Sequence, residues 1–361
     1  MKRSLCSLAF LTAFPCLASA MSVTLYGVAD VNISHFRNGD GHITSMNSGG
    51  LGGSRFGLRG VEKLSDRTDA IFVLEGGLNI NTGTSAQGGR MFGRQAYVGL
   101  RSKDYGTITA GRLQGLGYEF SGKYDPMMFA PGSVIGSLTG ESGRPWIYNP
   151  LADPARMDNA VLYKTPKWGG FQLGYQHGFR SAATDTTPRS KSYDLAALTY
   201  AEGPLSITYA FGRSTGTTYT TAATSSQTEH ALGVQYKFSW ATLFGTYQIR
   251  KTQGYSGSDH AWQVGARVPV SQAGHVHFAY GQSDNDTPWG RTDDIVDWGL
   301  RSWAVGYVHS LSKRTVLYTY FKQLDNRGNA RQTIFPPGGL PAPSETGDTV
   351  RAFGVGMQHR F

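Results

Sequence analysis

The sequence predicts an all-β protein, a 16-stranded antiparallel transmembrane β-barrel with a long third loop folded into its lumen. Strand-like runs alternate polar and apolar residues with a period of two, and no apolar run reaches the length of a membrane helix. Short and long connections alternate along the chain, as in an up-and-down barrel. One connection, residues 113–157, is longer than a compact domain tolerates unless the loop is functional or enclosed.

Residues 1–20 have the pattern of a cleaved secretory signal peptide: a basic start, a short apolar core and a small Ala-Ser-Ala cleavage site. Both cysteines, Cys6 and Cys16, lie inside this segment, so the mature chain, residues 21–361, contains none. The sequence therefore excludes disulfide scaffolds, thiol catalysis and cysteine metal sites in a single barrel domain.

The composition fits a barrel with one lipid-facing and one wet face. The chain has 48 glycines, 12% aromatic and 16% charged residues, which is more glycine and less charge than a soluble enzyme usually has. The formal net charge is +9, and it falls to +7 when Lys2 and Arg3 leave with the signal peptide. The basic residues are dispersed instead of clustered with aromatics, which argues against nucleic acid as a partner.

The first predicted strand, residues 22–34, places apolar residues such as Val23 and Ile33 on one face and Asp30 and Asn32 on the other. A long loop rich in glycine, serine and asparagine follows at residues 38–53. The next predicted strands cover residues 55–59, 69–81 and 91–101, with a short turn after the first and a small glycine-rich loop after the second.

The later connections separate into two kinds. Tight connections are predicted at residues 102–104, 165–169, 201–204, 238–240, 269–274 and 311–314. Longer polar connections are predicted at residues 180–189, 215–228, 252–258, 284–298 and 326–347. This asymmetry places turns at one rim and loops at the other, around about sixteen strands, which is enough for a water-filled lumen. In the last strand, Phe353, Val355, Met357 and Phe361 share an apolar face.

Six motifs occur in a fixed order along the mature chain. They are Ser22-Val-Thr-Leu-Tyr-Gly-Val28, Ser54-Arg-Phe-Gly-Leu-Arg-Gly60, Arg94-Gln-Ala-Tyr-Val-Gly-Leu100, Tyr105-Gly-Thr-Ile-Thr-Ala-Gly-Arg112, Leu311-Ser-Lys-Arg-Thr315 and Gly354-Val-Gly-Met-Gln-His-Arg-Phe361. Together they resemble the trimeric general porins of Gram-negative outer membranes, especially the β-proteobacterial type. The resemblance implies passive diffusion of small hydrophilic solutes and ions, a homotrimer, and contacts with outer-membrane lipid, lipopolysaccharide and the barrel assembly machinery. Phe361 fits the terminal aromatic residue of the insertion signal.

The resemblance also implies a pore constriction, in which basic wall residues face acids on the third loop. The basic positions are matched by Arg55, Arg59, Arg94 and Lys164, with Arg112 as a further candidate at the mouth of the loop. Tyr118-Glu-Phe-Ser-Gly122 resembles the Pro-Glu-Phe-Gly-Gly element that presents one carboxylate, here Glu119, although Tyr replaces Pro and Ser replaces the first Gly. Gly115 stands where some relatives have a second acid, and Asp125 is the other acidic candidate. An excess of bases over acids predicts weak anion selectivity.

The sequence offers little support for catalysis, a cofactor or a metal. Gly212-Arg-Ser-Thr-Gly216 matches a serine-hydrolase elbow, but it lies where a strand runs into a loop instead of a strand-to-helix turn, so a chance match is the better explanation. His275 and His277 share a strand face but have no third metal ligand nearby in sequence. The glycine run at residues 49–53 lacks the Lys-Ser/Thr of a phosphate cradle.

Four alternatives remain open at the level of sequence. Within the channel class, the altered element at residues 118–122 is compatible with a substrate-selective channel. A plugged barrel could instead act as an adhesin through the loops at residues 38–53 and 326–347, or as a barrel hydrolase. Phe361 and the outward apolar faces argue against the fourth alternative, a secreted β-sandwich.

Overall fold

The computed structural model describes residues 21–39, 41–127, 133–134, 156–179, 192–217, 224–254, 256–286, 298–334 and 345–361. The predicted signal peptide and most of the second half of the 113–157 segment, including Trp146 and Tyr148, lie outside these ranges.

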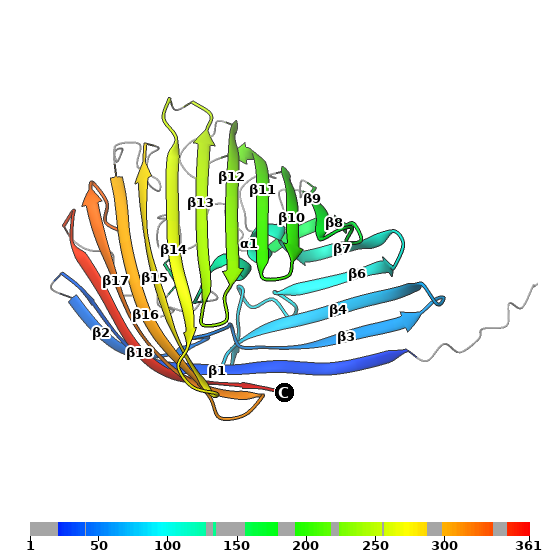
Figure 1. Cartoon of the computed structure of the whole chain (residues 1–361), viewed down its shortest axis with the longest axis horizontal. Helices are drawn as coiled ribbons and strands as arrows, with labels where there is room; N and C mark the ends of the chain where they lie inside the picture. The colour runs from blue at the N-terminus through cyan, green and yellow to red at the C-terminus, as the bar shows by residue number, and fades with distance from the viewer. Residues whose placement is uncertain are drawn as a thin grey trace, which may run out of the picture.

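The chain forms one antiparallel sheet that closes on itself. Successive strands pair in chain order, and the last strand, β18, pairs with β1 to complete the ring (Figure 1). The strands are β1 (Ser22–Asn38), β2 (Gly41–Ser48), β3 (Arg55–Lys63), β4 (Thr68–Asn79), β5 (Thr84–Ser85), β6 (Gln95–Ser102), β7 (Gly106–Gln114), β8 (Arg156–Lys164), β9 (Phe171–Gly178), β10 (Ser192–Glu202), β11 (Leu205–Thr217), β12 (Thr224–Lys237), β13 (Thr242–Thr252), β14 (Asp259–Pro269), β15 (Gly274–Asn285), β16 (Trp298–Ser310), β17 (Thr315–Gly328) and β18 (Thr349–Arg360).

Sixteen of the strands in the described ranges form the barrel wall, as the sequence predicts. The other two are local additions: β2 pairs with the second half of β1, and the two-residue β5 pairs with the end of β4. The first half of β1 pairs with β3 instead, so the ring continues past β2 without interruption.

The alternation of faces along the strands is confirmed. In β1, Ile33 is 50% exposed on the outer surface, whereas Asp30 and Asn32 are buried inside. In β18, Phe353, Val355 and Met357 are all exposed. The structure also shows which face points outward in two strands that carry apolar residues on both faces. Val98 and Leu100 of β6 point outward, and Tyr318, Tyr320 and Lys322 of β17 are buried inside. Lipid therefore meets apolar side chains and the lumen receives the polar ones.

The predicted tight turns join the wall strands at one rim, but three longer connections differ from expectation. Residues 38–53 were expected to form a loop but contain strand β2, because residues 41–48 fold back and pair with the second half of β1 as a hairpin. The connection expected at 215–228 is shorter, since β11 runs to Thr217 and β12 begins at Thr224. The segment after β7 begins with a helix, α1 (Leu116–Tyr124), where the sequence suggested irregular structure.

The apolar residues of helix α1 recur at a spacing of four, so the helix can bury one face against the wall. Leu116, Phe120 and Tyr124 lie on one face and are all buried. Glu119 lies in the first turn and Lys123 in the last, each at the end that the helix dipole favours. The Leu116 N–H donates a 3.0 Å hydrogen bond to Oε1 of Gln176 on β9. Among the described residues, no helix is long and apolar enough to cross a membrane.

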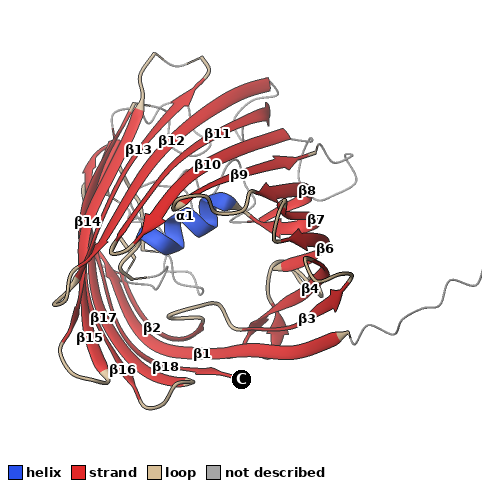
Figure 2. Cartoon of the chain, turned by 45° about the vertical axis from the view of Figure 1, so that its right-hand side comes forward, coloured by secondary structure: helices blue, strands red, loops and turns tan. Residues whose placement is uncertain are grey.

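The helix lies inside the ring of strands (Figure 2). Its apolar face packs against small residues of the wall, Ala197 on β10, Ala210 on β11 and Ala231 on β12. At Gly233, also on β12, a Cβ atom would lie 2.3 Å from Cδ2 of Tyr124, so only glycine allows this approach. The described part of the third loop is therefore accommodated by a strip of small wall residues within the lumen.

Candidate functional site

A buried acid organises the arginines of the wall. Glu75 on β4 lies opposite Gly57 on β3, in the middle of a group of basic side chains. Its Oε1 atom is 2.6 Å from Nε of Arg94, and its Oε2 atom is 3.6 Å from Nε of Arg55. Arg94 immediately precedes β6, and its backbone N–H donates to the carbonyl of Glu75 at 3.0 Å. The strands thus bring two of the predicted wall arginines onto one carboxylate.

Arg59 belongs to the same cluster but contacts an aromatic ring. Its Cζ atom lies 5.5 Å from the centre of the Tyr26 ring, within the range of a cation–π interaction. The Tyr26 hydroxyl in turn donates a 2.9 Å hydrogen bond to Oε2 of Glu75. Arg59 is exposed, so its charge faces water directly.

Arg112 lies in a second ion-pair group. Its Nη1 atom is 2.6 Å from Oδ1 of Asp158 on β8, and its Nε–H donates to the Gly93 carbonyl at 2.8 Å. Nη1 of Arg90 lies 2.7 Å from the other oxygen of Asp158. A single carboxylate therefore lies between two guanidinium groups.

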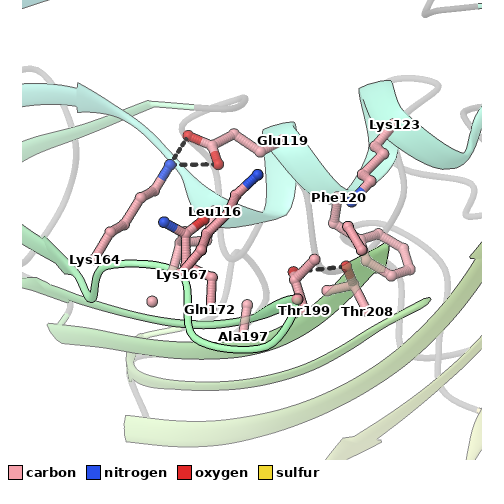
Figure 3. Close-up of a pocket in the computed structure, with 13 residues that line it drawn as sticks. Leu116, Glu119, Phe120, Lys123, Lys164, Lys167, Gln172, Ala197, Thr199 and Thr208 are labelled. Carbon is pink, nitrogen blue, oxygen red and sulfur yellow. Dashed lines mark hydrogen bonds and ion pairs between the residues drawn. The ribbon is translucent and has the colours of Figure 1, made fainter. Parts of the chain in front are cut away.

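The loop acid Glu119 pairs with Lys164 instead of facing the wall arginines. The Lys164 Nζ atom lies 2.5 and 2.6 Å from the two carboxylate oxygens of Glu119, on α1 (Figure 3). The side chain of Glu119 is 48% exposed and that of Lys164 is 26% exposed. Two of the predicted constriction residues therefore meet, in a wet environment.

Tyr118 connects the helix to the wall arginines. It forms a side-chain hydrogen bond with Arg94, and the Cζ atom of Arg156 lies 5.6 Å from the centre of its ring. Arg156 also donates from Nε to the Arg94 carbonyl at 3.2 Å. The tyrosine that replaces the proline of the family element thus adds a contact between loop and wall.

Asp125 lies apart from these groups and is fully buried, which differs from the expected position beside the channel. Its Oδ1 atom accepts a 2.9 Å hydrogen bond from the Met127 N–H, and it attracts Arg267 and Lys322 electrostatically.

Wall side chains hold the backbone on either side of this acid. Nη2 of Arg267 donates to the Pro126 carbonyl at 3.2 Å, the His277 Nδ1–H donates to the same carbonyl, and Nζ of Lys322 donates to the Ser133 carbonyl. The arrangement fastens the loop to β14, β15 and β17.

The remaining sequence motifs do not form reaction centres in the described residues. Ser214 of the elbow-like motif is buried within strand β11. The rings of His275 and His277 lie 4.6 Å apart, but no group of three metal-ligating side chains occurs in the described part of the chain. The amides of residues 50–52 bind an anion of the protein itself, the carboxylate of Asp30, at 2.8–3.0 Å.

Sequence reasoning missed Glu75, Asp158 and Asp30. Glu75 had a signal, because it is a carboxylate within the otherwise apolar run at residues 70–78, next to the strand that carries Arg55 and Arg59. A charge in such a position needs a partner. Asp158 directly follows the long loop and had no comparable signal in the sequence.

A closed antiparallel barrel with an apolar outer surface and a lumen lined by charged groups defines a membrane channel. The chain belongs to the Gram-negative porin family, whose sequence profile matches residues 7–329. It is an outer-membrane porin, a β-barrel channel for passive diffusion, and both family and fold are those of a non-enzymatic channel.

Relatives of known type cover the whole chain. Outer membrane porin protein 32 of Delftia acidovorans is 30% identical and an outer membrane porin protein of Bordetella pertussis is 28% identical, each over 100% of both chains. The structure of an anion-selective porin from Comamonas acidovorans matches with a TM-score of 0.80 and 27% identity, over 95% of this chain and 100% of that one. OmpT of Vibrio cholerae, described in a trimer form, shares the fold with a TM-score of 0.69 and 15% identity, over 95% and 100% of the chains.

Proposed function

We propose that this porin has a weak preference for anions, set by the charged side chains around the third loop. One observation carries the proposal: among the described residues, the connected charged groups contain more bases than acids. The bases are Arg55, Arg59, Arg90, Arg94, Arg112, Arg156 and Lys164, and the acids are Glu75, Glu119 and Asp158. A net positive, narrow wet passage lowers the free energy of a passing anion relative to a cation.

The predicted constriction residues take different parts in this proposal. Arg59 presents its charge to water, and Arg55 is partly exposed but shares Glu75 with Arg94. Arg94 and Arg112 are largely neutralised by their acids, and the Lys164–Glu119 pair adds a local dipole. Asp125 acts indirectly, because its buried carboxylate offsets the charges that hold the loop. The similarity to the porin described as anion-selective supports the same sign of selectivity.

We further propose that the protein is a homotrimer in contact with outer-membrane lipid and lipopolysaccharide. A hollow of about 650 Å³, lined almost wholly by apolar groups, lies on the outer wall over β1, β2 and β16–β18. Its lining includes Ile33, Met46, Leu317, Val355 and Met357. An exposed apolar surface of this kind suits a neighbouring subunit or a lipid chain.

The terminal residue supports recognition by the barrel assembly machinery. Phe361 is 50% exposed, and its backbone N–H and carbonyl bond with the carbonyl and N–H of Gly27 at 3.1 and 3.0 Å. Strand β1 therefore holds the C-terminal end of the chain in place, while the aromatic side chain of Phe361 remains accessible.

The reversal potential of the purified protein in a planar bilayer under a KCl gradient tests the anion preference. We expect a steady current whose reversal potential is shifted from zero towards the equilibrium potential of chloride. Cation selectivity would contradict the charge assignment while leaving the barrel intact. A correctly folded protein that carries no current would contradict the channel itself and favour a plugged barrel.

A further inference from the structure

A small cavity lies between part of α1 and the wall strands β8–β11. Its volume is about 130 Å³, roughly ten times the space that a single buried water needs. The helix contributes Glu119 and Lys123, and the wall and the β8–β9 turn contribute Lys164, Lys167 and Thr199 (Figure 3). The cavity, which lies beside the tight β8–β9 turn, therefore has room for a small polyatomic ion.

The lining of this cavity is strongly basic. Three lysines, Lys123, Lys164 and Lys167, face one glutamate, Glu119, among the described residues that line it. Both carboxylate oxygens of Glu119 lie within 2.6 Å of the Lys164 ammonium, so this acid is already engaged. The positive charge of Lys123 and Lys167 is thus not balanced by an acid in the lining.

Lys167 also lies close enough to Lys123 to disfavour the charge of the Lys123 ammonium. Burial lowers the pKa of Lys123, the Lys167 ammonium lowers it further, and Glu119 offsets this only in part. The Lys123 ammonium lies 5.4 Å from the centre of the Tyr124 ring. An anion between the two ammonium groups would replace this repulsion with two attractions.

The other polar groups of the cavity are already hydrogen bonded within the protein. The hydroxyls of Thr199 and Thr208 bond to each other at 2.8 Å, and the Gln172 amide donates to the Thr165 carbonyl at 2.9 Å. Glu202 lies nearby behind Gly170, where its carboxylate accepts from the Tyr200 hydroxyl at 3.4 Å. Recognition therefore depends on the lysines, which bind oxyanions as point charges.

We propose that this cavity binds a small oxyanion with the chemistry of phosphate, held between Lys123 and Lys167 with Lys164 at its edge. The proposal deepens the proposed anion preference and rests on it in one respect, because the anion reaches the cavity through a lumen that admits anions. It adds a saturable binding step to a channel otherwise described by diffusion alone.

The test measures chloride current through the purified porin in planar bilayers while inorganic phosphate is added. In the wild type, phosphate is expected to reduce the current and to saturate. Lys123→Gln and Lys167→Gln should each raise the half-blocking concentration about fivefold, as expected for the loss of one partly exposed charge contact. Lys123→Arg should keep the block, and Lys313→Gln, in the exposed turn after β16, should leave it unchanged.

The reversal potential in KCl, measured in the same membranes, separates this proposal from the proposed function. An anion preference without a saturable block, or a block equal in the wild type and in both glutamine variants, would overturn the oxyanion site alone. A cation preference would overturn the proposed selectivity, and a block weakened by both variants would still support the site. Broadening of the phosphorus NMR signal by detergent-solubilised protein, lost in Lys123→Gln, provides a readout that needs no current.

Discussion

Nε of Arg94 donates a 2.6 Å hydrogen bond to Oε1 of Glu75, and the two side chains are only 7% and 6% exposed. The same carboxylate accepts from the Tyr26 hydroxyl and lies 3.6 Å from Nε of Arg55. One acid therefore offsets two of the arginines that face the lumen. We therefore expect the selectivity of the channel to depend on this compensation as well as on the number of bases.

Glu75→Gln is expected to make the channel more anion-selective. The substitution keeps the size of the side chain but removes the charge that offsets Arg55 and Arg94. A unit charge at a few ångströms in a watery passage is worth at most about 1 kcal/mol, so the chloride-to-potassium permeability ratio should rise by about threefold. The reversal potential under a KCl gradient measures this ratio.

The control for this experiment is Asp66→Asn, which removes the same charge from the exposed turn between β3 and β4. It should leave the permeability ratio unchanged. An equal shift in both variants would mean that overall charge, and not the position of Glu75, determines selectivity.

Arg59→Gln and Arg94→Gln should separate selectivity from stability. Both remove one positive charge and should lower the anion preference. Arg59 is exposed and stacks on Tyr26, so its loss should leave the unfolding temperature nearly unchanged. Removing Arg94 leaves the buried Glu75 carboxylate without its closest cation, at a cost of about 3 kcal/mol. Heat-induced unfolding followed on gels measures stability, and reversal potentials measure selectivity. Equal destabilisation by the two variants would contradict a stabilising role of the buried Arg94–Glu75 pair.

The barrel could be predicted from the sequence because each strand carries its own periodicity. Asp30 and Asn32 alternate with Val31 and Ile33, and this pattern alone determines which face is wet. Helix α1 could not be predicted in the same way, because its short segment contains Gly117 and Gly122, which disfavour helices. Packing against the alanines of β10–β12 outweighs that preference, and this packing is not visible in local sequence.

The site residues could be located from motifs, but their partners could not. Arg55, Arg59, Arg94 and Glu119 stand at recognisable motif positions. The acid that binds Arg94 is 19 residues away in sequence, and Lys164 is 45 residues from Glu119. Such contacts depend on strand register and on the path of the loop.

Asp125 shows the same limit in another form. An acid on the third loop is expected at the channel, yet Arg267 and Lys322 draw it into the packing between loop and wall. Both of these bases come from strands far along the chain, β14 and β17. The local sequence around Asp125 therefore does not predict its pairing with Arg267 and Lys322.

Asp125→Asn is expected to loosen the third loop. The variant leaves the charges of Arg267 and Lys322 without this carboxylate in a buried site, which should lower the free energy of unfolding by about 3 kcal/mol. The single-channel current should become noisier, because the carbonyls of Pro126 and Ser133 are held by the same region of the wall. Unfolding in urea and current recordings provide the two measurements.

Asp325→Asn is the matched control for the loop prediction. Asp325 accepts hydrogen bonds from Gln323 and Thr349 and lies on the opposite face of β17 from Lys322. Its substitution should leave the current noise unchanged. If Asp125→Asn recordings were as quiet as those of the control, the carboxylate would have no role in holding the loop.

Gly233→Ala and Gly245→Ala test whether the wall positions the helix. The two glycines lie on the neighbouring strands β12 and β13, but an added Cβ meets Cδ2 of Tyr124 at 2.3 Å in the first and nothing within 4 Å in the second. Gly233→Ala should therefore displace Tyr124, whose hydroxyl bonds to Thr208 at 2.7 Å, and destabilise the protein by about 2 kcal/mol. Gly245→Ala should have little effect. Tyr124 ends the helix that carries Glu119, so only Gly233→Ala should change the single-channel conductance. Unchanged conductance in a folded Gly233→Ala protein would show that α1 does not control the width of the pore.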